Sequence, residues 1–119
     1  MQQMYHVLPR AIRPEELAAR LARAPAPVVV DLRKPDDYRA DPRIVPGAAK
    51  RDLARLPLWA PELPQDRFVV VYCQKGLSVA NAAVDALRAR GFTAVMIEGG
   101  FAAWQAAGLP LVDPPEPVR

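Results

Sequence analysis

The stretch Phe68-Val69-Val70-Val71-Tyr72-Cys73-Gln74-Lys75-Gly76-Leu77-Ser78 is the one around which the chain is organised. Its first five residues are β-branched or aromatic, which predicts a buried strand. The residues that follow carry small or apolar side chains at the spacing of one helix face, at Ala80, Ala83, Val84 and Leu87. A strand, a short loop and a helix therefore follow one another, and the only cysteine begins the loop.

The position of Cys73 suits a reactive thiolate. The backbone N–H groups of a tight strand-to-helix loop, together with the positive end of the helix dipole, stabilise a negatively charged sulfur. Lys75 adds a local positive charge. The same position also suits a small buried hydrophobe, which is a frequent role of free cysteine. The loop alone leaves both interpretations open.

The composition indicates one globular domain. The 119 residues are 51% hydrophobic and 24% charged, enough for one core without disulfides or metals. We expect a single domain over residues 1–112 and a proline-rich, frayed tail over residues 113–119. Because the chain has one cysteine and one histidine, His6, it has no internal disulfide, resolving thiol or N/S metal cluster. We expect neither a metal nor another cofactor.

The charge pattern narrows the range of partners. The net charge of +3 comes from arginines spread along the chain, whereas a nucleic-acid site needs a clustered basic face with aromatic platforms. We therefore expect a mild attraction for small anions and no nucleic-acid partner. No apolar run has the length of a bilayer span, and the first residues do not resemble a secretion signal. We expect no membrane partner and a cytoplasmic location; these patterns do not specify the oligomeric state.

Strand and helix patterns alternate along the chain. Strands are expected at residues 4–8, 28–32, 68–72 and 94–97, and helices after Arg13, Lys34, Ala49, Ser78 and Gly99. The helix over residues 50–58 is weakly patterned, and three prolines make a stiff connector after it. The alternation predicts an α/β fold with a central, mainly parallel sheet flanked by helices on both faces. The Cys73 loop would then lie at the carboxyl end of a central strand, where such folds place their sites.

Four segments in this order resemble motifs of the rhodanese domain, a family of sulfurtransferases. They are Asp31-Leu32-Arg33 followed by Asp37-Tyr38, Val45-Pro46-Gly47-Ala48, Val71-Tyr72-Cys73-Gln74-Lys75-Gly76, and Glu98-Gly99-Gly100 followed by Trp104. The resemblance extends from about Arg13 to Leu111. It implies the rhodanese-like α/β fold.

The resemblance also implies an activity. The enzyme would move sulfane sulfur from a small sulfur-containing anion, such as thiosulfate or polysulfide, to a thiol, a protein sulfur acceptor or cyanide. Cys73 would be the catalytic nucleophile and would carry the sulfur as a persulfide. The loop would bind the substrate through backbone N–H groups, and Arg33 would be a further substrate-binding residue. The loop residues concerned are Gln74, Lys75, Gly76, Leu77, Ser78 and Val79.

Several of these residues fit a second role. Gly76 either permits a tight turn or is an ordinary loop glycine. Lys75 either attracts anionic sulfur donors or is a solvated loop residue without a role in binding. Asp31 and Arg33 would point the same way from the end of their strand. For this pair we favour a structural ion pair, with Asp31 supporting the nearby loops, over acid–base chemistry.

Two departures from expected motifs bear on the reaction. Many family members end the loop with arginine where this chain has Ser78, which weakens the case for thiosulfate, a dianion that arginine would clamp. We expect Ser78 to be the N-cap of the following helix.

Phosphatases and arsenate reductases of this architecture need Cys-x5-Arg, whereas the sixth residue after Cys73 is Val79. Oxyanion hydrolysis through a phosphocysteine is therefore disfavoured.

Two classes of function follow. The main hypothesis is an enzyme of the thiosulfate sulfurtransferase-like, rhodanese type that works through a Cys73 persulfide. The alternative is a rhodanese-like binding or regulatory module with little or no turnover, suggested by Ser78 in place of arginine. The presence of Cys73 favours the enzyme, because inactive members often lose that residue. A persulfide relay to a dedicated protein acceptor would use the same cysteine.

Overall fold

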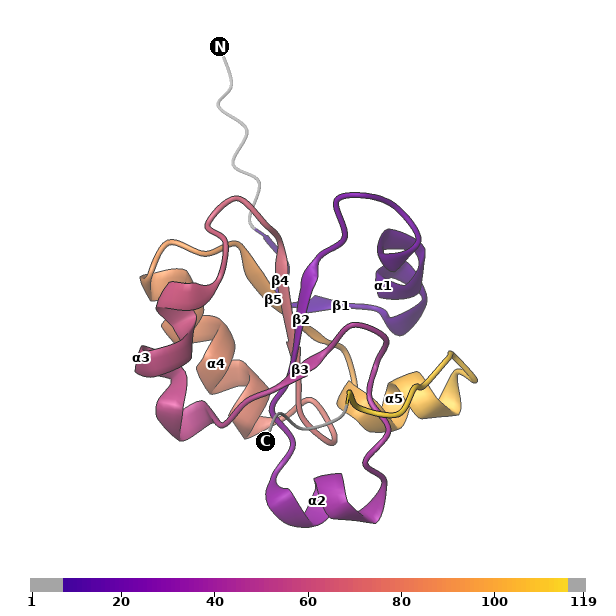
Figure 1. The fold of residues 1–119 in the computed structure, drawn as a ribbon. Helices are drawn as coiled ribbons and strands as arrows, with labels where there is room; N and C mark the ends of the chain where they lie inside the picture. Colours follow the sequence, from indigo (N-terminus) through magenta and orange to yellow (C-terminus); the bar gives the residue numbers. More distant parts are fainter. Residues whose placement is uncertain (1–7, 116–119) are drawn as a thin grey trace.

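The computed structural model describes residues 8–115 of the chain. Five parallel strands form one sheet in the order β1-β5-β4-β2-β3 (Figure 1). They are β1 (Ala11–Ile12), β2 (Val28–Asp31), β3 (Ala49–Lys50), β4 (Val69–Tyr72) and β5 (Ala94–Ile97). This arrangement confirms the predicted α/β class, and it makes β4, the strand before Cys73, the central one.

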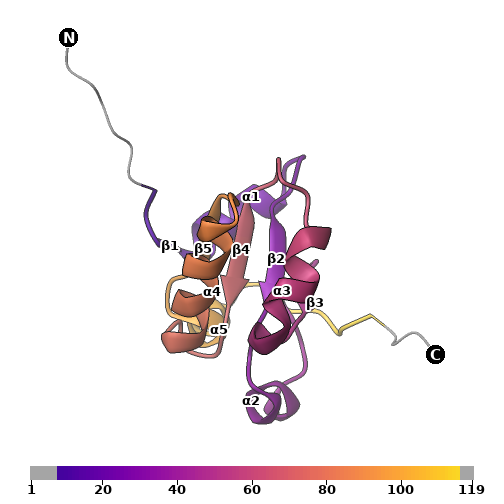
Figure 2. The same cartoon turned by 90° about the vertical axis from the view of Figure 1, so that its left-hand side faces the viewer.

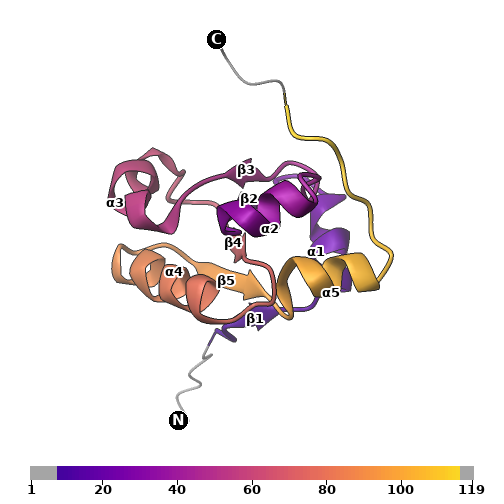
Figure 3. The ribbon, with the colours of Figure 1, turned by 90° about the horizontal axis from the view of Figure 1, so that it is seen from below.

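Helices cover both faces of the sheet (Figures 2 and 3). Helices α1 (Pro14–Leu21) and α5 (Gly100–Ala106) pack on one face, and α3 (Leu56–Trp59) and α4 (Ser78–Ala89) pack on the other. The short helix α2 (Pro35–Ala40) lies beyond the carboxyl ends of the strands (Figure 1). Within residues 8–115, every helix is too short or too polar to cross a bilayer.

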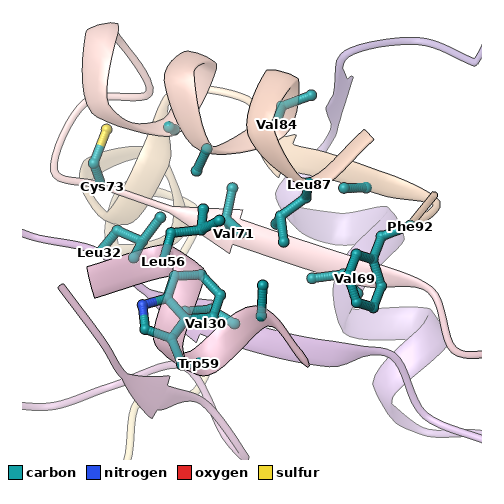
Figure 4. Packing of buried hydrophobic residues seen from close by; sticks show 14 residues of the cluster. Val30, Leu32, Leu56, Trp59, Val69, Val71, Cys73, Val84, Leu87 and Phe92 are labelled. Atoms are coloured by element: carbon teal, nitrogen blue, oxygen red, sulfur yellow. The ribbon is translucent and has the colours of Figure 1, made fainter. Parts of the chain in front are cut away.

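Each face of the sheet buries its own hydrophobic cluster. Val69 and Val71 of β4 pack with α3 and α4 (Figure 4), whereas Val70 and Tyr72 pack with α1 and α5. All four β4 residues are fully buried. Burying a side chain of this size stabilises the fold by about 1.5–3 kcal/mol. Helices on both faces thus explain why the strand is an unbroken apolar run rather than an alternating one.

Between β3 and β4 the structure differs from the prediction of one helix over residues 50–58 and a stiff connector. Lys50 belongs to β3, and a 3-10 turn over Leu53–Arg55 leads into α3. A second 3-10 turn over Ala60–Glu62 follows α3 directly. Pro57 and Pro61 stand in the first turns of these short helices, where a backbone N–H has no intrahelical partner, and Pro64 follows the second turn. Pro57 and Pro61 therefore begin helical turns instead of preventing them.

The ends of the domain differ from prediction in part. Residues 4–7 of the predicted first strand, with His6, lie outside the described residues, as do residues 116–119 of the predicted tail. The strand at that edge of the sheet is instead β1. Near the other end, Val112 pairs with Ile44 as an antiparallel bridge with two backbone hydrogen bonds of 2.8 and 2.9 Å. The chain is thereby held to the domain as far as Val112.

Candidate active site

Cys73 directly follows β4 and lies at the carboxyl edge of the sheet, as the sequence predicted. The residue is 7% exposed, and its side chain lies at one end of the cluster beneath α3 and α4, beyond Val71 (Figure 4). Residues 73–77 form the loop that leads into α4. Cys73 also lines a cavity of about 340 Å³. This volume suits a small ligand.

One wall of this cavity comes from the predicted loop and the start of α4. Its residues are Gln74, Lys75, Leu77, Ser78 and Val79. Of the loop residues expected to bind substrate, only Gly76 is absent from the lining. The structure therefore brings five of the predicted site residues together around Cys73.

The rest of the lining comes from Lys34 and Asp37, which were not predicted as site residues. Lys34 precedes α2, and Asp37 lies in its first turn. Strand β2 pairs with β4, so the segment after β2 lies beside the Cys73 loop. Asp37 belongs to the first family-like motif and Lys34 directly follows Arg33 in it, but only the strand order indicates that both line the cavity of the cysteine. Lys34 and Lys75 give the cavity positive charge, and the carboxylate of Asp37 gives it one negative charge.

Two glycines let backbone segments approach closely beneath the loop. Gly76 has a φ of +71° and Gly100 a φ of +65°, both in the left-handed region that favours glycine. A Cβ on Gly76 would lie 3.0 Å from the nitrogen of Gly99. A Cβ on Gly100 would lie 2.4 Å from the carbonyl oxygen of Cys73. Gly76 therefore permits a tight turn, and the absence of side chains at Gly99 and Gly100 leaves space for that turn.

The first turn of α5 binds carbonyl groups of the loop. The N–H of Phe101 donates to the carbonyl of Cys73, and the N–H of Ala102 donates to that of Gln74, both over 2.9 Å. Because the C=O and N–H of a trans peptide point in opposite directions, these bonds turn the N–H groups of Gln74 and Lys75 away from α5. Among residues 8–115, the N–H groups of residues 74–79 have no protein acceptor. The loop thus carries a set of unpaired donors next to Cys73.

A buried ion pair supports the base of the loop. The Nη2 of Arg33 lies 2.8 Å from Oδ2 of Asp31, and neither side chain is exposed. The hydroxyl of Tyr72 donates to the same carboxylate over 2.8 Å. Burial, reinforced by the charge of Asp31, raises the pKa of Tyr72 above its usual range. Since Arg33 also lies 3.8 Å from the ring centre of Phe101, the pair connects β2, β4 and α5 around Cys73.

The guanidinium of Arg33 takes no part in the cavity at Cys73. Further donors of this guanidinium bind the backbone carbonyls of Asp41 and Arg43, at 2.7 and 2.8 Å. Four of its five N–H donors are thus occupied, and the fully buried side chain does not line the cavity at Cys73. The direct contact between Arg33 and a substrate therefore stays a prediction, and the cavity at Cys73 gives it no support. The structure agrees with the structural ion pair favoured for Asp31 and Arg33.

The predicted capping role of Ser78 is wrong. Leu77 is the N-cap of α4, no side chain caps it, and Ser78 is already the first helical residue. A capping side chain must come from a residue whose own backbone is still outside the helix. Ser78 is exposed and lines the cavity instead. Beside Cys73, the buried Oε1 of Gln74 has no hydrogen-bond partner within the described part of the chain.

The sequence profile of the rhodanese-like domain matches residues 13–107. The chain belongs to the rhodanese family. A sulfurtransferase from Allochromatium vinosum is 34% identical over 101 residues, covering 84% of this chain and 92% of that relative. Thiosulfate sulfurtransferase GlpE from Pseudoalteromonas translucida is 33% identical over 81 residues, covering 67% of this chain and 74% of that relative.

A solved structure shows the same fold. The rhodanese-related protein from Thermoplasma volcanium matches with a TM-score of 0.74 at 26% identity, covering 87% of this rhodanese and 97% of that chain. The rhodanese resemblance and the rhodanese-like fold predicted from the sequence are thereby confirmed. The family and these relatives also confirm the predicted enzyme class, the sulfurtransferases.

Proposed function

We propose that this rhodanese transfers sulfane sulfur through a persulfide on Cys73. One observation carries the proposal: the only cysteine lines a cavity next to a loop whose N–H groups have no acceptor within the described part of the protein. Such donors stabilise the negative charge of a thiolate and of the outer persulfide sulfur. The residues that would supply them are Gln74, Lys75, Gly76, Leu77, Ser78 and Val79.

In the first half-reaction, the Cys73 thiolate attacks the outer sulfur of a donor such as thiosulfate. A new S–S bond forms to Cys73, the S–S bond within thiosulfate breaks, and sulfite leaves with the electron pair. Lys34 and Lys75 would attract the dianion to the cavity, because neither forms an ion pair among residues 8–115. Thiosulfate is supported as a donor by the name of the relative from Pseudoalteromonas translucida.

In the second half-reaction, an acceptor attacks the outer sulfur and the Cys73 thiolate leaves. A thiol acceptor forms a new S–S bond, and cyanide forms a C–S bond. Because the chain has no second cysteine, the acceptor is an external thiol, a protein thiol or cyanide. The proposal needs neither a metal nor a redox cofactor, since each step exchanges one bond to sulfur for another.

Ser78 shapes the choice of donor in this proposal. Its short side chain leaves the cavity without the guanidinium fork that would hold a sulfonate group at two oxygens. Lysine ammonium groups attract a dianion but do not bind it in that planar, two-point manner. We therefore expect thiosulfate to be used at high KM, and a polysulfide donor to be used more efficiently.

The proposal is tested by thiocyanate formation from thiosulfate or polysulfide and cyanide, with Cys73→Ser and Ser78→Ala compared with the parent. Loss of the nucleophile should lower turnover by at least about a thousandfold, with an unchanged thermal unfolding curve. Ser78→Ala should retain turnover within about tenfold, because Ser78 lines the cavity without a reacting role. Retained turnover in Cys73→Ser contradicts the proposal. An alkylatable Cys73 with no turnover from either donor would indicate a binding module instead.

A further inference from the structure

A second cavity adjoins the one at Cys73. Its volume is about 370 Å³, and it shares Lys34 and Val79 with the first cavity. Leu32, Leu53 and Val79 contribute apolar surface to its wall. Its lining comes from the segments that follow β2 and β3, neighbours in the sheet, and from the 3-10 turn after β3. A ligand with its sulfur at Cys73 can therefore extend past Val79 into this second space.

The second cavity has an excess of unpaired positive charge. Lys34, Lys50 and Arg51 line it, and none forms an ion pair within residues 8–115. The charge of Arg33, which also borders the cavity, is neutralised by its buried partner. The carboxylate of Asp52 accepts a hydrogen bond from the N–H of Ala54 over 3.0 Å. The unpaired cations therefore outnumber the carboxylates on this wall.

Lys50 is the cation that the fold holds partly buried. Burial lowers the pKa of Lys50, the charge of Arg33 acts in the same direction, and the carboxylates of Asp31 and Asp52 oppose both. Its Nζ donates to the carbonyl of Arg51 over 3.1 Å and lies 5.6 Å from the ring centre of Tyr38. Further N–H donors of this ammonium stay available. A partly desolvated cation with spare donors is stabilised by a bound anion.

We propose that this cavity binds the carboxylate-bearing end of a low-molecular-weight thiol, the acceptor that takes sulfur from Cys73. Lys50 and Arg51 recognise the carboxylate, and the apolar wall holds the body of the molecule. The inference rests on the proposed sulfur transfer: the acceptor thiolate attacks the outer persulfide sulfur, one S–S bond forms, and the Cys73 thiolate leaves. The two adjoining cavities have the size of small-molecule sites, which favours a small thiol over a protein acceptor.

The kinetic test compares glutathione with its diethyl ester as acceptors, because the ester keeps the thiol and masks both carboxylates. With the parent enzyme, kcat/KM should be about tenfold higher for glutathione. In the double variant Lys50→Met/Arg51→Gln this preference should fall below about twofold, mainly through KM. The control Arg23→Gln/Arg90→Gln removes the same charge from exposed positions outside both cavities and should keep the preference. Equal use of both acceptors by the parent overturns the inference.

A binding measurement makes the test independent of turnover. S-methylglutathione cannot accept sulfur, and calorimetric titration should show about tenfold weaker binding to Lys50→Met/Arg51→Gln than to parent and control. Indistinguishable binding to all three proteins overturns the inference even if sulfur transfer is normal. Conversely, the proposed function fails when Cys73 forms no persulfide, whatever the titration shows. The two failures are therefore distinguishable.

Discussion

The backbone N–H of Phe101 lies 2.9 Å from the carbonyl oxygen of Cys73. Gly100 comes so close to the same oxygen that a Cβ there would lie only 2.4 Å from it. The helix that begins with Gly100 thereby fixes the peptide that follows the nucleophile. The geometry of the Cys73 loop therefore depends on a segment far along the chain.

Replacing Gly100 with alanine should therefore displace the Cys73 loop. Gly108 is a matched control, because its φ is +70° but an added Cβ would meet nothing within 4 Å. We expect Gly108→Ala to cost about 1–2 kcal/mol of unfolding free energy from backbone strain alone. Gly100→Ala should cost at least about 3 kcal/mol, because the backbone contact adds to that strain. Urea denaturation of both variants measures this difference, and an activity assay of the folded fraction reports on the loop. Equal losses of unfolding free energy in the two variants contradict the account.

The buried ion pair gives a second stability prediction. Asp31→Asn leaves the charge of Arg33 buried without its carboxylate, which should lower the unfolding free energy by about 3–5 kcal/mol. Asp36→Asn removes the exposed partner of Arg39 and should change the unfolding free energy by less than about 1 kcal/mol. Both values come from urea denaturation followed by circular dichroism. Similar small effects at the two positions would show that the buried pair does not support the loop.

The third prediction concerns acid stability. The side-chain hydrogen bond from Arg43 outweighs partial burial and lowers the pKa of Asp41 to about 2, from 3.8. Because the folded pKa lies below the unfolded one, this stabilisation is present above about pH 4 and lost as pH falls through about 2. Asp41→Asn should thus be less stable than the parent at pH 6 and almost equally stable at about pH 1, below both pKa values. Unfolding free energies at both pH values test this, and a difference independent of pH contradicts it.

The fourth prediction concerns the donor. Ser78→Arg places a guanidinium on the cavity wall, and kcat/KM for thiosulfate should rise by about tenfold or more, mainly through KM. Ser78→Gln introduces a long, uncharged side chain at the same position and should produce no such gain. Initial rates of thiocyanate formation over a range of thiosulfate concentrations measure both. A comparable gain in Ser78→Gln would show that side-chain length, rather than charge, limits thiosulfate use.

The parts of the fold that the sequence predicted are those with strong local patterns. The apolar run before Cys73 and the helical spacing after it each specify one element, and so does the proline at the start of α1. Residues 50–58 were predicted only in part, because the helical turns there cover Leu53–Trp59 and Pro57 suits both a connector and the first turn of a helix. There the tertiary contacts decide the outcome, as Leu56 and Trp59 are buried against the sheet.

The site residues that are close together in the sequence could be predicted, whereas those brought to the cavity only by the fold could not. Cys73 and its loop follow one strand, so their place at the sheet edge could be expected from sequence alone. Lys34 and Asp37 reach the cavity only because β2 pairs with β4, which no local pattern specifies. The burial of Arg33 likewise depends on the distant Phe101 and on the carbonyls of Asp41 and Arg43, which follow α2.

The central claim is that Cys73 carries sulfur as a persulfide, and intact-mass spectrometry tests it most directly. The parent and Cys73→Ser are incubated separately with thiosulfate and with polysulfide, and excess donor is removed before measurement. The account predicts that the parent gains the mass of one sulfur atom, that cyanide or a thiol removes it, and that Cys73→Ser gains none. No sulfur gain by the parent with either donor, or an equal gain in Cys73→Ser, would contradict it.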